Sequence, residues 1–391
     1  MSTDVSALPH DLVRPRYGTD SLAGVLPGVA GALGVEHVTS TGIDAADACR
    51  DLGLPAAERV CVVLVDGLGY ANLADRAGHA PFLRSLLPAA RRLSTSFPST
   101  TAAALGTFGT GTAPGRTGML GYTQRNPATG GLANMVSWDG APPPAELQQE
   151  PPVLRVVAGA GIAVASTGPA RFAGSGMTVA ALSGGTYLAA ESLADRVDRT
   201  VRALRSPGLV YLYWGEVDKA GHHHGSESWQ WGDELEALDR ELARLARSLP
   251  TGTLLVITAD HGMVDVDLAA RWDVAATPEL SRDVELVGGE PRAVHVYTSP
   301  GSAEAVASRW TDVLGDAAVV ALRDDLVDAG RFGPGTSDRV RPTIGDVVVA
   351  MRGRATVVDT RTQTAASLTL VGVHGSLTAR EMQVPLLVAQ A

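Results

Sequence analysis

The sequence predicts an α/β protein in which buried parallel strands alternate with helices. Three continuous apolar runs carry this prediction, namely Arg59 to Asp66 (RVCVVLVD), Leu209 to Trp214 (LVYLYW) and Leu254 to Asp260 (LLVITAD). Runs of this kind are typical of parallel strands that are covered on both faces. Between the second and third runs, Gln230 to Leu249 places leucines on one face and charged residues on the other, which indicates a packing helix.

Length and charge limit the class of protein. With 391 residues, the chain has room for one large α/β domain or for a domain with an insertion. The formal net charge of -10, from 32 Lys and Arg against 42 Asp and Glu, argues against a broad basic surface for a nucleic acid polymer. A small phosphorylated ligand held by metal ions is compatible with this charge. The abundance of Ala, Gly, Val, Arg and Asp favours a high-GC bacterial source.

The first residues give no indication of export. They read MSTDVSALPHDLVRPRYG and lack a basic segment followed by an apolar one, and no stretch approaches about 18 consecutive apolar residues. We therefore expect a cytoplasmic protein without a membrane partner. Residues 1–45 carry Pro9, Pro15 and Pro27 and are expected to form an irregular arm over the body.

Two adjacent hydroxyls, Thr100 and Thr101, are presented within the stretch Ser96 to Thr112 (SFPSTTAAALGTFGTGT), at the start of a small-residue helix. A helix N-terminus offers free N–H groups and the positive end of a dipole, and both favour a threonine alkoxide and a neighbouring phosphate. An ordinary Ser/Thr-capped turn is the simpler explanation of this stretch taken alone. In the same way, Asp66 alone could be only a turn former before Gly67.

The segment from Gly115 to Asp139 is expected to be a loop. It carries Tyr122, Asn126 and Trp138, which are polar or stacking candidates for substrate contact. The sequence leaves open whether this loop faces a substrate or only covers the body.

Metal-ligating residue types follow the second and third apolar runs. Asp218 and His222 are four residues apart, a separation that lets both side chains reach one ion in a helical turn or compact loop. Because three histidines run together there, a non-specific metal-affine tract is the alternative. Asp260 and His261 form an adjacent pair at a strand end, whereas His374 alone is more typical of a core or loop histidine.

The sequence pattern changes near Ser281, where short predicted strands and helices begin to alternate. We expect residues 281–341 to form a small inserted α+β cap on a core made of residues 1–280 and 342–391. The expected elements after this point are strands at Ala293 to Tyr297 and Ala317 to Leu322, a helix at Ala303 to Leu314, strands at Thr343 to Met351 and Thr356 to Asp359 that return to the main sheet, and a last strand at Val384 to Ala389.

Together, the polar residues at these positions make a suitable ligand set for two metal ions. The set comprises three carboxylates and three imidazoles, from Asp66, Asp218, Asp260, His222, His261 and His374. Divalent metals such as Zn²⁺ and Mn²⁺ suit this mixture of oxygen and nitrogen donors. Six ligands exceed one tetrahedral site, so two ions about 3.5–4 Å apart are expected to share them.

With these residues in view, the sequence resembles the alkaline phosphatase superfamily, and within it the type I phosphodiesterase/nucleotide pyrophosphatase family. The matching motifs are VVLVDGLG (Val62 to Gly69), FPSTT (Phe97 to Thr101), EVDKAGHHHG (Glu216 to Gly225), ADHGM (Ala259 to Met263) and VHG (Val373 to Gly375). The resemblance implies a doubly wound, mostly parallel sheet with a cap inserted between the last two motifs.

The resemblance also implies roles for individual residues. One metal would lie on Asp66, Asp260 and His261, and the other on Asp218, His222 and His374. Thr101 would be the nucleophile, would bridge toward the first metal and would form a phosphothreonine intermediate that water then releases with retention at phosphorus.

One position departs from the family pattern. Members often carry an Asn just after the nucleophile turn to hold a phosphate oxygen, whereas Ala102 to Ala104 follow Thr101 here. Backbone N–H groups or Asn126 are the candidate replacements.

Among related proteins, the sequence looks most like the actinobacterial cyclic-di-AMP phosphodiesterases, which implies hydrolysis of cyclic-di-AMP through pApA to AMP. Tyr122, Trp138 and Arg292 are then candidates for base or phosphate contacts. Two alternatives are a carbon–phosphorus hydrolase similar to phosphonoacetate hydrolase and a nucleotide-binding sensor without turnover.

Overall fold

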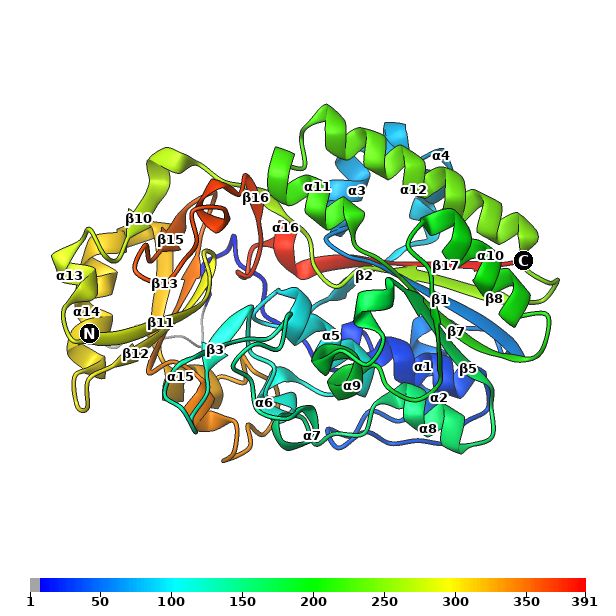
Figure 1. Cartoon of the computed structure of the whole chain (residues 1–391), viewed down its shortest axis with the longest axis horizontal. Coiled ribbons are helices and arrows are strands. Elements are labelled where there is room, and N and C mark those ends of the chain that lie inside the picture. Colours follow the sequence, from blue (N-terminus) through cyan, green and yellow to red (C-terminus); the bar gives the residue numbers. More distant parts are fainter. Residues whose placement is uncertain (1–7) are drawn as a thin grey trace.

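A seven-stranded, mostly parallel sheet forms the centre of the larger part of the molecule (Figure 1). The structure is a computed structural model that describes residues 8–391. The strand order is β2-β17-β8-β1-β7-β5-β6, with β17 antiparallel to both of its neighbours. The strands are β1 (Arg59–Val65), β2 (Arg91–Ser94), β5 (Val164–Gly168), β6 (Thr186–Ala189), β7 (Gly208–Trp214), β8 (Leu254–Thr258) and β17 (Gln383–Gln390). The predicted mostly parallel α/β sheet is confirmed.

Helices cover both faces of this sheet, which explains why its central strands are continuous apolar runs. In Figure 1, α3, α4, α11 and α12 lie on one side of the sheet, and α1, α5, α8 and α9 lie on the other. Their bounds are α1 (Val25–Ala32), α3 (Tyr70–Asp75), α4 (Pro81–Leu86), α5 (Thr101–Thr110), α8 (Val153–Gly159), α9 (Gly176–Ala181), α11 (Glu216–His224) and α12 (Trp229–Ser248); α10 (Leu193–Ala203) packs against α12. The leucine-faced helix predicted from Gln230 is α12.

The expected irregular arm at residues 1–45 is partly wrong. Residues 1–7 lie outside the described part of the chain, but Val25–Ala32 forms α1, whose residues are almost all buried. This helix packs against α2 (Ala45–Leu52). Pro27 lies in the first turn of α1, where a missing N–H is tolerated. Helix α1 is apolar on all sides, which is typical of a buried helix and not of a surface arm.

A second, six-stranded antiparallel sheet forms the other part of the molecule, at the left of Figure 1. Its order is β13-β14-β12-β11-β3-β4, with β3 (Thr123–Arg125), β4 (Leu132–Asn134), β11 (Val284–Glu290), β12 (Ala293–Thr298), β13 (Ala318–Leu322) and β14 (Val347–Met351). Helix α14 (Ala303–Leu314) packs on this sheet and buries Trp310 against it.

The strands expected to return to the main sheet near residues 343–359 do not do so. β14 pairs with β12 and β13, while β15 (Thr356–Val358) pairs with β10 (Arg271–Asp273) in a separate two-stranded sheet. The segment from Gly115 to Asp139 also contains more than a loop, because it supplies the hairpin β3–β4. Three of the six strands lie in the expected cap, residues 281–341, and the division of the chain into core and cap stays a prediction.

Within residues 8–391, every helix is too short or too polar to cross a bilayer.

Candidate metal centre

The predicted aspartates meet at one edge of the main sheet. Asp66 directly follows β1, Asp260 lies two residues beyond the end of β8, and Asp218 lies in the first turn of α11, which follows β7. Because β1, β7 and β8 are adjacent and parallel, their carboxyl ends lie together. The amide of Gly67 donates to Oδ1 of Asp260 at 3.0 Å, which joins two of these strand ends.

The three predicted histidines are oriented in the same way. Each has Nδ1 next to a backbone carbonyl oxygen: His222 at 2.7 Å from Gly372, His261 at 3.1 Å from Gly262 and His374 at 2.9 Å from Ser99. A carbonyl only accepts hydrogen bonds, so each Nδ1 carries a proton and each Nε2 of a neutral ring has a free lone pair. This arrangement is the usual one for histidines that bind a metal.

The free Nε2 atoms lie beside the carboxylates. Nε2 of His222 is 3.1 Å from Oδ2 of Asp218, and Nε2 of His261 is 3.3 Å from Oδ1 of Asp66. Ligand atoms of Asp66, Asp260 and His261 all lie within 4.8 Å of one another, as do those of Asp218, His261 and His374. The structure therefore brings all six predicted ligands into one cluster.

Buried carboxylate oxygens without partners show that cations fit this cluster. Oδ1 of Asp66, Oδ1 of Asp218 and Oδ2 of Asp260 are buried and make no hydrogen bond within the described chain. Isolated buried carboxylates are strongly unfavourable unless cations or donors accompany them. Divalent ions would supply this charge, and oxygen and imidazole donors are suitable ligands for them.

The pKa values of these groups reflect their burial and the closeness of the carboxylates to one another. Burial, and then the nearby Asp260 and Asp218, raise the pKa of Asp66 well above its usual value. Burial would lower the pKa of His222, but Asp218 outweighs it and raises the pKa to about 9. Burial lowers the pKa of His374 well below its usual value. Without metal, Asp218 and His222 thus form a charged pair.

Thr101 lies at the first position of α5, directly beside this cluster. Its Oγ1 is 3.1 Å from Nε2 of His261. Unlike its neighbours in the turn, which are buried, Thr101 is partly exposed and lines the cavity. Ser99 fixes the turn, because its amide donates to the carbonyl of Gly375 at 2.9 Å and its hydroxyl donates to that of Ser376 at 2.7 Å.

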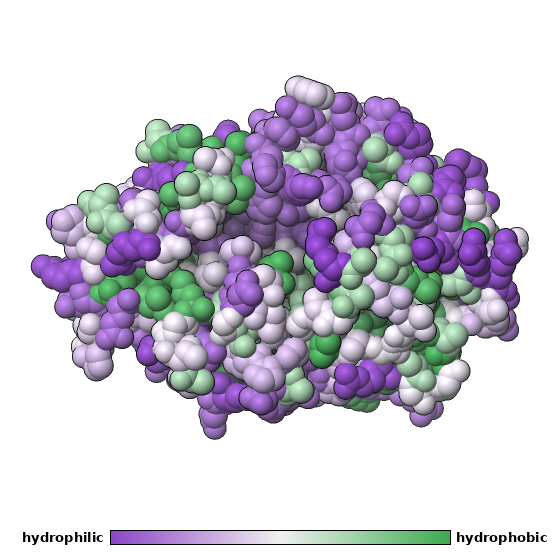
Figure 2. Space-filling view, in the orientation of Figure 1, coloured by the Kyte–Doolittle hydropathy of each residue, from purple (hydrophilic) through white to green (hydrophobic). Residues whose placement is uncertain are grey.

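A cavity of about 510 Å³ opens over the cluster, between the main sheet and the second sheet. Figure 2 shows the surface hollowed on this face. Tyr122 lines the cavity, as predicted for a substrate contact, and is 46% exposed. Its role in binding stays a prediction.

The structure does not bring Asn126 and Trp138, two of the predicted substrate contacts, to the lining of this cavity. Nδ2 of Asn126 donates to the carbonyl of Gly140 at 2.8 Å, and its Oδ1 accepts from the amide of Ala128. The indole N–H of Trp138 donates to the carbonyl of Pro142 at 2.8 Å. Both side chains therefore stabilise their own loop, and the predicted contact of Asn126 with a phosphate oxygen would require it to leave these hydrogen bonds.

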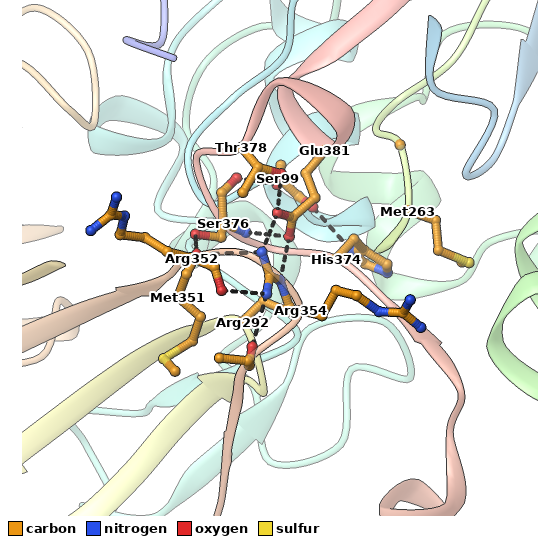
Figure 3. Close-up of polar contacts among 12 residues, drawn as sticks. Ser99, Met263, Arg292, Met351, Arg352, Arg354, His374, Ser376, Thr378 and Glu381 are labelled. Carbon is orange, nitrogen blue, oxygen red and sulfur yellow. Dashed lines mark hydrogen bonds and ion pairs between the residues drawn. The ribbon is translucent and has the colours of Figure 1, made fainter. Parts of the chain in front are cut away.

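Arg292, another predicted substrate contact, is also absent from the cavity lining. Its side chain is fully buried, and Nε and Nη2 lie 3.0 and 2.7 Å from the two carboxylate oxygens of Glu381 (Figure 3). The remaining N–H groups donate to the carbonyls of Met351, Arg352 and Ala355, so the guanidinium has no free donor for a substrate phosphate. Glu381 also accepts from the amide of Ser376 at 2.9 Å. The pair therefore anchors the segment that follows His374.

Several residues around the site were not predicted from the sequence. Tyr213 donates from its hydroxyl to Oδ2 of Asp66 at 2.6 Å. Phe172, Tyr187 and Tyr213 contribute to a smaller, mostly apolar pocket of about 60 Å³ beside Thr101. Glu290, the last residue of β11, lines the large cavity. Tyr213 lies near the end of a predicted strand that leads into the Asp218 motif, and this position could have identified it as a residue of the site.

Comparison with known proteins agrees with this architecture. The model of the family "Type I phosphodiesterase / nucleotide pyrophosphatase" matches residues 60–377, which include every predicted ligand and Thr101. Human ectonucleotide pyrophosphatase/phosphodiesterase family member 7 is 40% identical over 67 residues, 16% of this chain and 15% of that protein. Human family member 5 is 34% identical over 85 residues, 20% of this chain and 18% of that protein. These matches span less than a fifth of either relative.

Solved structures show the same fold. Murine ectonucleotide pyrophosphatase/phosphodiesterase 5 superposes with a TM-score of 0.67 at 18% identity, covering 84% of this chain and 87% of that one. An inactive variant of that protein was solved in complex with AMP. Phosphonoacetate hydrolase from Sinorhizobium meliloti 1021 has a TM-score of 0.66 at 21% identity, covering 85% and 90% of the two chains.

Proposed function

The chain belongs to the type I phosphodiesterase/nucleotide pyrophosphatase family, and from this premise we propose that it hydrolyses nucleotide phosphodiesters through Thr101 with two divalent metal ions. The observation that carries the proposal is the position of the Thr101 hydroxyl, 3.1 Å from Nε2 of His261 and beside a cluster in which each of three aspartates has one buried carboxylate oxygen without a hydrogen bond.

Six residues and Thr101 would hold the two ions. Asp66, Asp260 and His261, with Thr101, would bind one ion, and Asp218, His222 and His374 would bind the other. When bound, the ions supply positive charge that favours the Thr101 alkoxide and stabilises charge developing on the phosphate. Either Zn²⁺ or Mn²⁺ accepts these ligands.

The protein groups around Thr101 orient the reaction. Tyr213 fixes one oxygen of Asp66 and leaves the other free for a cation. The first amides of α5 have no acceptor within the helix, so they are available to bind an anion at its N-terminus. We assign them the phosphate-oxygen contact that an Asn makes in many family members.

The reaction then proceeds in two displacements. The oxygen of Thr101 bonds to phosphorus while the bond from phosphorus to the departing alcohol breaks, which leaves a phosphothreonine. Water attacks this phosphorus next, frees Thr101 and gives net retention of configuration. Catalysis of this kind depends mainly on positioning and charge stabilisation.

As the specific substrate we propose cyclic-di-AMP, cleaved through pApA to AMP. The small aromatic pocket beside Thr101 offers apolar surface to one base, and the cavity of about 510 Å³ has room for the rest of a dinucleotide. The AMP complex of the murine relative gives a precedent for an adenine nucleotide in this fold. A cytoplasmic location would match such a substrate.

A carbon–phosphorus hydrolase is the second candidate, favoured by the structural likeness to phosphonoacetate hydrolase. Assays of metal-loaded protein with cyclic-di-AMP, pApA, bis-p-nitrophenyl phosphate and phosphonoacetate separate the candidates. We expect turnover of the diesters with AMP as the final nucleotide product. Turnover of phosphonoacetate alone would reject the phosphodiesterase, and tight nucleotide binding without any turnover would indicate a sensor.

A further inference from the structure

Glu290 is a buried acid that has no part in the proposed mechanism. It is 7% exposed, and neither carboxylate oxygen makes a hydrogen bond of ordinary geometry within residues 8–391. Burial raises its pKa to about 8, although the hydroxyl of Thr100 and the backbone at Tyr122 lie close enough to lower it. Its side chain packs so closely on Gly375 that a Cβ there would lie 2.7 Å from Cγ of Glu290.

Among the described residues of the cavity lining, His222 is the side chain whose positive charge acts on Glu290, and His222 becomes neutral when it binds a metal. No lysine or arginine lines this cavity in the part of the chain that the structure describes. Three other acids line it. Asp66 and Asp218 belong to the metal cluster, and Asp359 is paired with Arg361 at 2.6 Å. Among the described residues, Glu290 is therefore the one acid of the cavity lining that neither the cluster nor an ion pair accounts for.

A buried acceptor without a donor is unfavourable. The fold keeps Glu290 in this position, at the wall of the cavity that Thr101 also lines. A molecule that enters the cavity with an N–H group would satisfy an oxygen of this carboxyl.

We propose that Glu290 is a specificity-determining residue, whose carboxyl accepts a hydrogen bond from an amino or ammonium N–H group of the substrate. The inference rests on the proposed function, because it assumes that the substrate is a phosphate ester that reacts at Thr101. Glu290 lies beside Thr100, the neighbour of the nucleophile, so the N–H group binds in the same cavity as the phosphate. Such a group is present both on an adenine base and on an alkylammonium ester.

Binding to metal-loaded protein tests this without requiring turnover. Two ligand pairs differ only in the donor group: AMP against purine riboside 5′-monophosphate, and phosphoethanolamine against ethyl phosphate. The variants are Glu290→Met, which removes the acceptor, and Glu290→Gln, which keeps one carbonyl oxygen. Glu285→Gln is the matched control, because Glu285 is an exposed acid on the same strand.

We expect wild-type protein to bind the donor-bearing member of one pair about tenfold more tightly by calorimetry. This ratio should fall to about one in Glu290→Met, be intermediate in Glu290→Gln and be unchanged in Glu285→Gln. The pair that shows the preference identifies the source of the N–H group, base or ammonium.

Equal affinities within both pairs in wild-type protein would overturn the inference, as would a preference that survives in Glu290→Met. A parallel loss of affinity for both members, with reduced metal content, would also overturn it, since Glu290 would then support the metal cluster. Failure of the proposed function looks different: wild-type protein would show the binding preference and yet hydrolyse none of the diesters.

Discussion

The hydroxyl oxygen of Thr101 lies 3.1 Å from Nε2 of His261, so the proposed nucleophile and a proposed metal ligand already touch. Replacing Thr101 by Ala should therefore reduce kcat by at least about a thousandfold while metal content stays near normal. Rates with bis-p-nitrophenyl phosphate and elemental analysis check this. Thr100→Ala is the control and should retain most activity. An active Thr101→Ala variant would transfer the role to Thr100, Ser99 or water.

Loading the metal-free protein with metal should release protons. In the metal-free protein, Asp218 raises the pKa of His222 to about 9, so His222 is protonated at pH 7. A histidine must be neutral to bind a metal, so binding displaces this proton and weakens as the pH falls. Calorimetry in buffers of different ionisation enthalpy measures the release.

The neighbouring histidines provide the matched control for that experiment. His222→Gln should bind one ion fewer and lose the corresponding proton release. His224→Gln should behave as wild type, because His224 is exposed at the end of α11. Equal proton release by both variants would contradict the assignment of His222 as a ligand.

The ion pair of Arg292 with Glu381 should matter for stability rather than for substrate affinity. Removing one partner leaves a buried charge, so Arg292→Met or Glu381→Gln should lower the free energy of unfolding by about 3–5 kcal/mol. The double variant Arg292→Met with Glu381→Met should recover part of this loss. Thermal denaturation and KM are measured together. A raised KM with an unchanged free energy of unfolding would instead indicate that Arg292 contacts the substrate.

Stability should fall on mild acidification because of His295. This histidine is fully buried, its Nδ1 accepts from the amide of Gly345 at 3.0 Å, and burial lowers its pKa to about 4. The unfolded chain, with a histidine pKa of about 6.5, binds the proton first. The contribution of His295 is therefore complete above about pH 6.5 and is lost as the pH falls toward 4, by about 3 kcal/mol in total.

Urea unfolding of wild type and His295→Gln at several pH values checks this. The variant should be less stable at pH 7, since it packs less well, but the difference from wild type should shrink as the pH falls. A difference that is constant between pH 7 and 5 would contradict the depressed pKa.

The parts of the site that sequence reasoning found are those carried by strand ends. Asp66 and Asp260 follow apolar runs, and because parallel strands end at one edge, their convergence follows from the fold. The position at a helix start drew attention to Thr100 and Thr101 together, and the resemblance to the family then favoured Thr101. Asn126 and Trp138 make hydrogen bonds within their own loop instead, and such short-range contacts leave no sequence pattern that distinguishes these residues from ligand-binding ones.

Non-local pairing accounts for most of the remaining differences. β3 joins β11 across more than 150 residues, and no local periodicity encodes that contact. Arg292 and Glu290 lie close together in sequence at the end of one hairpin, yet one is saturated by Glu381 and the other has no ordinary hydrogen bond within the described chain. The different environments of Arg292 and Glu290 can therefore be seen only in the three-dimensional structure. The helix at Val25–Ala32 was missed because its Gly and Pro suggested an irregular segment.

The position of β17 determines the order in which the main sheet can be completed during synthesis. This strand lies between β8 and β2 although it is made after every other strand of the sheet. A nascent chain can pair β1 with β8, but the outer edge of β8, with its apolar sequence LLVIT, has no partner until residues 383–390 leave the ribosome. Unpaired apolar edges of this kind template association with other chains. Ribosomes stalled shortly before Gln383 should therefore carry the form of this protein that is most dependent on chaperones.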